Sequence, residues 1–392
     1  METTLLKKIA ILAVATCCLV GIDILADTTS TSGRKSKPAV HSSSLHASTG
    51  KKSARTAVRR TRGGRRARRG SLWRISSFGE PAASDNPAGE DPAIRQAAIE
   101  ALGNWNGSIV VADPNTGRVL SVVNQKLALQ GAFTPCSTFK PVVALGALKE
   151  GLITPQTKLR VGRRTRMKLA DALARSNNPF FLKLGQMLGF ERVAEYAHEF
   201  GFGEKAGLNI PGESPGKFPP APPKEGGVGH LAYTGQDMEV TPLQMAAVIS
   251  AIANGGTLYY LQYPRTAEET AQFEPRVRRR LEGLAKYFPH IREGMAAAVI
   301  YGTGRLAYSP DEQIFGKTGT CSEDGARLGW FVSYANEQQP KYVVVVLLRG
   351  GRLMFGPHAA EIAGHLYRDL RHKDQNPTQA TRISAFASRV QR

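Results

Sequence analysis

The hydrophobic pattern changes twice along the folded part of the chain, from strand-like to helical and back. Residues 107–113 and 117–123 are short apolar runs joined by the turn sequence Pro-Asn-Thr-Gly, which predicts a β-hairpin. Similar runs occur near the other end, at 328–335 and 342–349. Helical patterns occur at 92–102, 137–150, 170–175, 178–188, 193–200, 241–254, 295–301 and 358–370. We therefore expect an α+β fold (an α/β sandwich), in which distant segments form one antiparallel sheet flanked by helices, with a mostly helical insert.

Residues 1–27 have the pattern of an export segment. Lys7 and Lys8 precede residues 9–26, which are apolar apart from a threonine, a glycine and an aspartate. This run is short for a membrane span and long for the core of a signal peptide, so a cleaved signal peptide and a membrane anchor are both open. Either interpretation predicts an exported, periplasmic or otherwise extracytoplasmic protein, anchored to the cytoplasmic (inner) membrane or secreted after cleavage.

Residues 28–90 have the composition of a disordered basic linker. Ser, Thr, Gly and Arg dominate, and the stretch from Arg34 to Arg74 contains no acidic residue. Such a segment repels itself and cannot bury a core. It is either a solvated tether or, through the arginines at 59–69, a segment that binds anionic lipid or wall polymer. No nucleic-acid partner is expected for an exported chain. The folded domain is expected at residues 91–372, followed by a flexible tail at 373–392.

A serine and a lysine at the start of one predicted helix are the first candidates for chemistry. Ser137 and Lys140 are three residues apart, so a helix places both side chains on one face. A lysine can take the proton of a serine hydroxyl if burial or a nearby positive charge lowers its pKa. The same spacing recurs at Ser32, Ser48 and Ser214, but no helix follows those copies, so we interpret them as chance matches.

Two further motifs follow in a fixed order. Ser176-Asn177-Asn178 comes after a helical run, and Gly316-Lys317-Thr318-Gly319-Thr320 comes just before a strand-like segment. Acyl transfer from serine needs a base, a proton donor for the leaving amine, an oxyanion hole and a substrate anchor. The motifs offer each of these. Lys140 is the candidate base, kept neutral by the charge of Lys317. Ser176 is the candidate proton relay, and Asn178 is expected to hold a substrate amide. A substrate carboxylate would be held by Lys317, Thr318, Gly319 and Thr320, and the oxyanion by the backbone N–H groups of Ser137 and Thr320.

Together the three motifs resemble the signature of penicillin-binding proteins, specifically the D,D-transpeptidase domain of class B enzymes, over about residues 107–370. Residues 235–256 and the closing helix are also similar to these transpeptidases. The resemblance implies a β-lactamase/transpeptidase-like fold and a serine acyltransferase that needs no cofactor. It implies acylation by the D-Ala-D-Ala end of peptidoglycan stem peptides, cross-linking to a neighbouring stem, and covalent inhibition by β-lactams.

The cysteines add one expectation. Cys17 and Cys18 belong to the export segment, whereas Cys136 and Cys321 flank the two proposed oxyanion-hole residues. In the family that the chain resembles, a glycine usually stands in place of Cys136. If both N–H groups point at one oxygen, the two cysteines lie close enough for a disulfide, which would persist outside the cytoplasm. Two buried free thiols are the alternative. The histidines and cysteines show no metal-binding spacing, and no metal is expected.

Other functions of the same fold stay open at this point. A D,D-carboxypeptidase would use water as the acceptor, and a β-lactamase would also need a group that activates water, for which the sequence offers no evident carboxylate motif. A non-catalytic β-lactam sensor is a further alternative. Two other motif matches are interpreted as loops or turns: Gly212–Gly216, because prolines follow its serine, and the glycine-rich stretch at 302–307, because it follows a helix.

Overall fold

The computed structural model describes residues 73–208 and 210–375. The expected export segment, the arginine run at 59–69 and nearly all of the expected tail lie outside these residues. Among the described helices, none combines the length and the apolar character that a membrane crossing requires.

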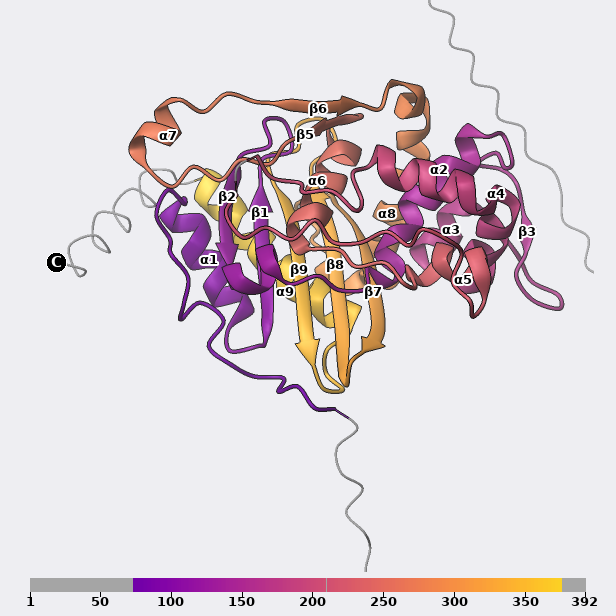
Figure 1. The fold of residues 1–392 in the computed structure, drawn as a ribbon, viewed down its shortest axis with the longest axis horizontal. Coiled ribbons are helices and arrows are strands. Elements are labelled where there is room, and N and C mark those ends of the chain that lie inside the picture. The colour runs from indigo at the N-terminus through magenta and orange to yellow at the C-terminus, as the bar shows by residue number, and fades with distance from the viewer. Residues whose placement is uncertain (1–72, 209, 376–392) are drawn as a thin grey trace, which may run out of the picture. The chain divides into compact units, whose positions relative to one another are not determined.

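The centre of the fold is a five-stranded antiparallel sheet, which confirms the fold class predicted from the sequence (Figure 1). Its strands, in the order β2-β1-β9-β8-β7, come from the two ends of the described chain. They are β1 (Gly107–Ala112), β2 (Val119–Val123), β7 (Ile314–Glu323), β8 (Ala326–Ala335) and β9 (Val343–Gly350). β7 forms one edge of the sheet. The Gly316–Thr320 motif therefore lies inside a strand, whereas we had expected a strand only after it.

Both faces of the sheet are covered, and residues 343–348 of β9 are accordingly all apolar. Val343, Val345 and Leu347 point into one hydrophobic cluster, and the alternate residues Val344 and Val346 point into the other. This follows from the two-residue period of a strand. The second cluster is closed by α1 (Pro92–Leu102) and α9 (Gly356–Gln375), which pack against each other and against the sheet.

The opposite face carries the helical insert. It contains α2 (Lys140–Lys149), α3 (Leu169–Ala174), α4 (Asn178–Glu199), α5 (Gly227–Thr234), α6 (Pro242–Ala253), α7 (Ala267–Ala271) and α8 (Phe288–Ile300). Two small sheets, β3 (Leu159–Arg160) with β4 (Arg166–Met167) and β5 (Thr257–Tyr259) with β6 (Val277–Arg280), lie within it. Shorter turns are the π-helix η1 (Lys126–Gln130) and the 3-10 helices η2 (Cys136–Phe139), η3 (Glu282–Tyr287) and η4 (Arg305–Ala307).

One predicted helix differs from the structure at its start. The helix expected from residue 137 begins with the tight 3-10 turn η2, so only its second part, α2, is α-helical. The two helices expected at 178–188 and 193–200 are confirmed: α4 consists of two helical segments that meet at a kink at Gly189, where φ is 78° and ψ is 166°. A glycine tolerates that conformation without a Cβ clash.

The folded domain starts earlier than predicted. Residues 73–90 were assigned to the basic linker, yet Phe78 pairs with Trp105, and Asp85 and Glu90 bind the buried guanidinium of Arg95. Polar contacts hold this segment rather than apolar burial, so its composition gave no sign of structure. At the other end, α9 continues past residue 372 to Gln375.

Candidate active site

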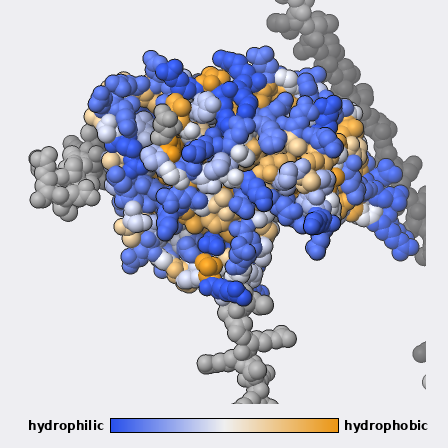
Figure 2. Space-filling model, in the orientation of Figure 1, coloured by the Kyte–Doolittle hydropathy of each residue, from blue (hydrophilic) through white to orange (hydrophobic). Residues whose placement is uncertain are grey.

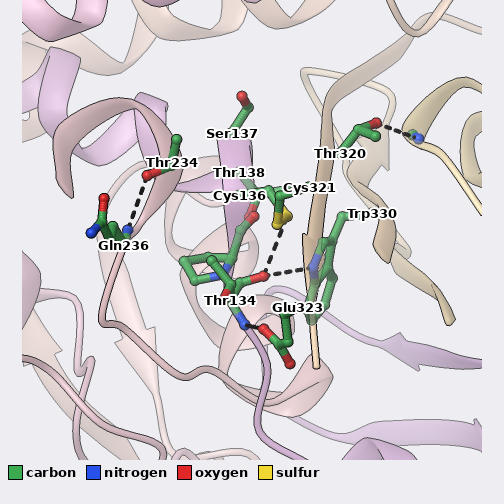
Figure 3. Close-up of a disulfide and its surroundings, with 12 residues drawn as sticks. Thr134, Cys136, Ser137, Thr138, Thr234, Gln236, Thr320, Cys321, Glu323 and Trp330 are labelled. Atoms are coloured by element: carbon green, nitrogen blue, oxygen red, sulfur yellow. Dashed lines mark hydrogen bonds between the residues drawn. A yellow bond between two sulfur atoms is a disulfide. The ribbon is translucent and has the colours of Figure 1, made fainter. Parts of the chain in front are cut away.

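Ser137 lies in the first tight turn before α2, and its hydroxyl is partly exposed. Cys136, the residue before it, has a φ of 53°, a left-handed conformation that is uncommon for any residue with a side chain. In Figure 3 the side chain of Ser137 points away from Thr134 and from the Cys136–Cys321 disulfide. The Ser137 hydroxyl donates to the backbone carbonyl of Tyr233 at 3.4 Å.

The Ser176–Asn178 segment forms a second corner of the site, between α3 and α4. Ser176 also has a left-handed φ, 52°, and the side chain of Asn177 caps α4 by accepting the N–H of Phe180 at 2.9 Å. Asparagine favours such a cap because its short side-chain oxygen satisfies an N–H that has no partner within the helix. The cap and the strained turn together present Ser176 and Asn178 to Lys140. Strained backbone of this kind concentrates at functional sites.

Two buried lysines meet at the hydroxyl of Ser176. Lys140 Nζ donates to Ser176 Oγ at 3.1 Å, to the Ser176 carbonyl at 2.9 Å and to Asn178 Oδ1 at 2.6 Å. Lys317 Nζ donates to the same Ser176 Oγ at 2.8 Å and to the carbonyl of Thr318 at 2.9 Å. The three sequence motifs therefore converge on one hydroxyl. In the described chain, no hydrogen bond joins Lys140 directly to Ser137.

Burial lowers the pKa of both lysines. Each side chain is fully buried. Desolvation is the main reason that the pKa of Lys140 lies well below its usual value, and the charge of Lys317 lowers it further. Desolvation alone lowers the pKa of Lys317 to about 7. We had expected the charge of Lys317 to be the main reason for a neutral Lys140; burial is the larger cause.

Thr318, Gly319 and Thr320 lie in β7, the edge strand. Gly319 faces the nucleophile turn, where a Cβ would lie 3.0 Å from the carbonyl oxygen of Pro135. The hydroxyl of Thr318 is buried against the hydroxyl of Thr303 at 2.5 Å. Thr320 is exposed, and its Oγ1 accepts the N–H of Gly356 at 2.8 Å. That bond leaves the hydroxyl proton of Thr320 free to be donated.

Cys136 and Cys321 form a disulfide, as one of the two sequence interpretations proposed, with their Cα atoms 5.7 Å apart. The bond ties η2 to β7. Thr134, just before η2, makes two further contacts with the sheet: its carbonyl accepts from Trp330 Nε1 on β8 at 3.0 Å, and its N–H donates to Glu323 Oε2 on β7 at 2.7 Å. In Figure 3 the hydroxyls of Ser137 and Thr320 lie on the same side of this disulfide. The disulfide therefore links the nucleophile turn to the edge strand.

Sequence reasoning missed two partners of the site. The carbonyl of Tyr233 accepts from Ser137, and Thr303 holds Thr318. Thr303 lies between two glycines, and Tyr233 lies just before the stretch at 235–256 that resembles the transpeptidases. A backbone carbonyl has no residue-type signature, so the role of Tyr233 could not be predicted from the sequence. The described residues contain no group of His, Cys, Asp or Glu side chains that could hold a metal ion.

Comparison with known proteins agrees with this geometry. Residues 107–368 match the family described as the penicillin binding protein transpeptidase domain. Stage V sporulation protein D of Bacillus subtilis is 32% identical over 286 residues, covering 64% of this chain and 44% of that protein. The peptidoglycan D,D-transpeptidase MrdA of Acinetobacter baumannii is 25% identical over 354 residues, covering 70% and 52%. The chain thus spans about half the length of these curated relatives.

Solved structures show the same fold. The transpeptidase domain of Burkholderia pseudomallei penicillin-binding protein 3 superposes with a TM-score of 0.62 at 22% identity, covering 73% of this chain and 95% of that one. The D,D-transpeptidase domain of a peptidoglycan glycosyltransferase from Eggerthella lenta gives 0.57 at 23% identity, covering 72% and 81%. Since the family match spans most of the chain, this protein belongs to the penicillin-binding protein transpeptidase domain family.

Proposed function

We propose that this chain is a serine D,D-transpeptidase of the class B kind, which cross-links peptidoglycan through an acyl-enzyme and is acylated by β-lactams. The observation that carries the proposal is the meeting of Lys140 and Lys317 at the hydroxyl of Ser176, next to the partly exposed Ser137. A neutral lysine, a relay hydroxyl and a second amino group provide the proton transfers that acyl transfer from a serine needs.

In the acylation half of the reaction, Ser137 Oγ attacks the carbonyl of the penultimate D-Ala, and its proton passes to neutral Lys140. The N–H groups of Ser137 and Thr320 stabilise the oxyanion. Asn178 holds the substrate amide, and Lys317 with Thr318 and Thr320 holds the terminal carboxylate across the backbone of Gly319. When the C–N bond breaks, the proton returns through Ser176 to the departing amine of D-Ala, which leaves an ester on Ser137.

In the second half, the amine of a neighbouring stem peptide attacks that ester. The attacking amine gives up a proton to Lys140, the ester C–O bond breaks, and Ser137 Oγ regains a proton. The products are a new peptide bond and the free enzyme. In the described chain, no Asp or Glu side chain is hydrogen-bonded to Ser137, Lys140, Ser176 or Lys317. A carboxylate that would activate water is therefore not hydrogen-bonded to these groups, which favours transfer over β-lactamase activity.

Acylation by a fluorescent penicillin tests the proposal. We expect a long-lived adduct whose mass maps to Ser137, and we expect Ser137→Ala to abolish it. Ser214→Ala is the matched control, because Ser214 has the same spacing to a lysine but lies in a loop. An adduct on another residue, or none, would contradict the mechanism, and rapid release of the adduct would favour the hydrolytic alternatives.

We also propose that the domain works outside the cytoplasm, where peptidoglycan stem peptides are found and where the Cys136–Cys321 disulfide would persist. The basic residues at 59–69 would then lie close to anionic lipid or wall polymer. The retention of the full-length chain on anionic vesicles, compared with a chain in which these arginines are glutamines, tests this binding.

A further inference from the structure

A basic hairpin projects from the helical insert beside α4 and α5. β3 and β4 pair with Leu159 opposite Met167 and Arg160 opposite Arg166, and the loop between them forms the tip (Figure 1). Residues 151–170 contain no acidic side chain, and the cations on and beside this hairpin are Lys158, Arg160, Arg163, Arg164, Arg166 and Lys168. None of these cations forms an ion pair with any residue that the structure describes.

The charge distribution is unfavourable for the hairpin itself. Arg160 and Arg166 lie directly opposite each other on adjacent strands, both exposed, and like charges in this position destabilise a pair of strands. Arg163 and Arg164 at the tip add to the repulsion. Local repulsion without a compensating partner in the fold is typical of surfaces whose partner is a ligand. Figure 2 shows strongly hydrophilic surface where this hairpin projects.

One side of the hairpin is apolar. Val161 packs against the main hydrophobic cluster. A shallow, open cavity of about 440 Å³ lies between Arg160–Gly162 of the hairpin, Pro179, Leu182 and Lys183 of α4, and Tyr233. Asn178 also lines this cavity, and it binds Lys140. Because Tyr233 accepts from Ser137 through its carbonyl, the cavity lies next to both the nucleophile and the amide-holding asparagine.

We propose that this cavity, with Arg160 of the β3–β4 hairpin and Lys183 of α4 in its wall, is a subsite for an acidic part of the acyl-donor peptide. The inference rests on the proposed function, because Asn178 there holds the amide just before the reacting carbonyl. A group that continues beyond this amide enters the cavity. Its aliphatic part packs against Val161 and Leu182, and a carboxylate at its end meets Arg160 and Lys183.

The chemistry of the cavity favours a peptide carboxylate over a membrane surface. The walls formed by Val161, Leu182 and Tyr233 are suited to an aliphatic or peptide segment, and one wall carries the candidate catalytic Asn178. A lipid surface is flat and would meet only the exposed tip. A ligand with one end at Ser137 and an anionic end beyond the amide held by Asn178 meets both the cavity and its cations.

Two penicillins that differ by one carboxylate provide the test. Benzylpenicillin and its α-carboxy derivative share the reacting ring, so the ratio of their second-order acylation constants on the full chain isolates the carboxylate. In R160Q/R166Q we expect the acylation constant of the α-carboxy compound, divided by that of benzylpenicillin, to fall about threefold to tenfold. In the unaltered chain, raising the salt concentration should shift the ratio in the same direction.

Matched variants separate recognition from folding. R276Q/R280Q removes the same charge from another two-stranded sheet, where Arg280 lies on β6 and Arg276 directly precedes that strand, and should leave the ratio as it is in the unaltered chain. R160Q/R166Q should not lower the thermal midpoint, because it removes a repulsive pair. An unchanged ratio in R160Q/R166Q would overturn the inference. It would do so even if the variant bound anionic vesicles less well, because the hairpin would then contact lipid rather than the donor peptide. Failure of benzylpenicillin to label Ser137 in the unaltered chain would instead overturn the proposed function.

Discussion

At the scale of single residues, the site depends on two lysines held where water cannot reach them. The order and spacing of the motifs were enough to predict that Lys140, Ser176, Asn178 and Lys317 would meet, and they do meet. The sequence could not predict the balance between desolvation and charge repulsion, because burial depends on segments far away in the chain. Nor could it show that the hydroxyl of Ser137 would donate to the carbonyl of Tyr233.

The lowered pKa values predict a bell-shaped pH profile for acylation. Lys140 acts as a base only when neutral, so the second-order constant rises with pH through its lowered pKa. Lys317 holds an anion only when charged, so the constant falls as the pH passes about 7. Lys317→Met should reduce the constant on the order of a hundredfold, because one preorganised charged donor is lost.

The same variant should remove the falling limb and move the rising limb to higher pH, because the charge that lowers the pKa of Lys140 is gone. Stopped-flow acylation across the neutral range measures both limbs. A rising limb that moves to lower pH would contradict this assignment. Lys149→Met, on the last turn of α2, is the control and should leave both limbs in place.

At the scale of elements, the nucleophile turn and the edge strand act as one unit. The sequence predicted a helix from residue 137 and a strand just after the Gly316–Thr320 motif; the helix exists, and the strand β7 already includes the motif. It did not predict the 3-10 turn η2, because a short turn has no hydrophobic period of its own. The positive φ of Cys136 explains in physical terms why a glycine is suited to this position: glycine adopts a left-handed conformation without steric cost.

This conformation predicts an unusual effect of substitution at Cys136. Two double variants lack the disulfide, C136G/C321S and C136S/C321S. We expect the glycine variant to be more stable by about 1 kcal/mol, because serine in a left-handed turn carries a Cβ penalty. The midpoints and slopes of urea unfolding give the difference. Equal stability, or a more stable serine variant, would show that the turn relaxes once the disulfide is removed.

At the scale of the whole molecule, the boundary of the folded part was the least predictable feature. Asp85 and Glu90 both bind Arg95, and Glu90 also accepts the hydroxyl of Ser121 at 2.8 Å. A buried polar network of this kind joins the segment at 73–90 to α1 and β2 without an apolar pattern. Composition therefore assigned it to the linker, whereas the periodic apolar segments of the sheet and of α1 were predicted well.

The buried network predicts a large effect from one substitution. Arg95→Met leaves two carboxylates buried without their cation, and we expect the free energy of unfolding to fall by about 3–5 kcal/mol. Denaturant unfolding of the chain measures this. Arg192→Met, which removes a half-exposed guanidinium paired with Glu195 on the surface of α4, should have little effect. Similar losses for the two variants would contradict the structural role of the network.

The place of β9 has a consequence for how the protein is made. This strand lies between β1 and β8, and its partner Gly107 pairs with Leu348, so the sheet joins the two ends of the described chain. Contacts between residues so distant in sequence make folding slow. A growing polypeptide cannot complete the sheet until residue 350 has emerged from the ribosome. Until then the sheet lacks its middle strand, and β1 and β8 have no neighbour between them.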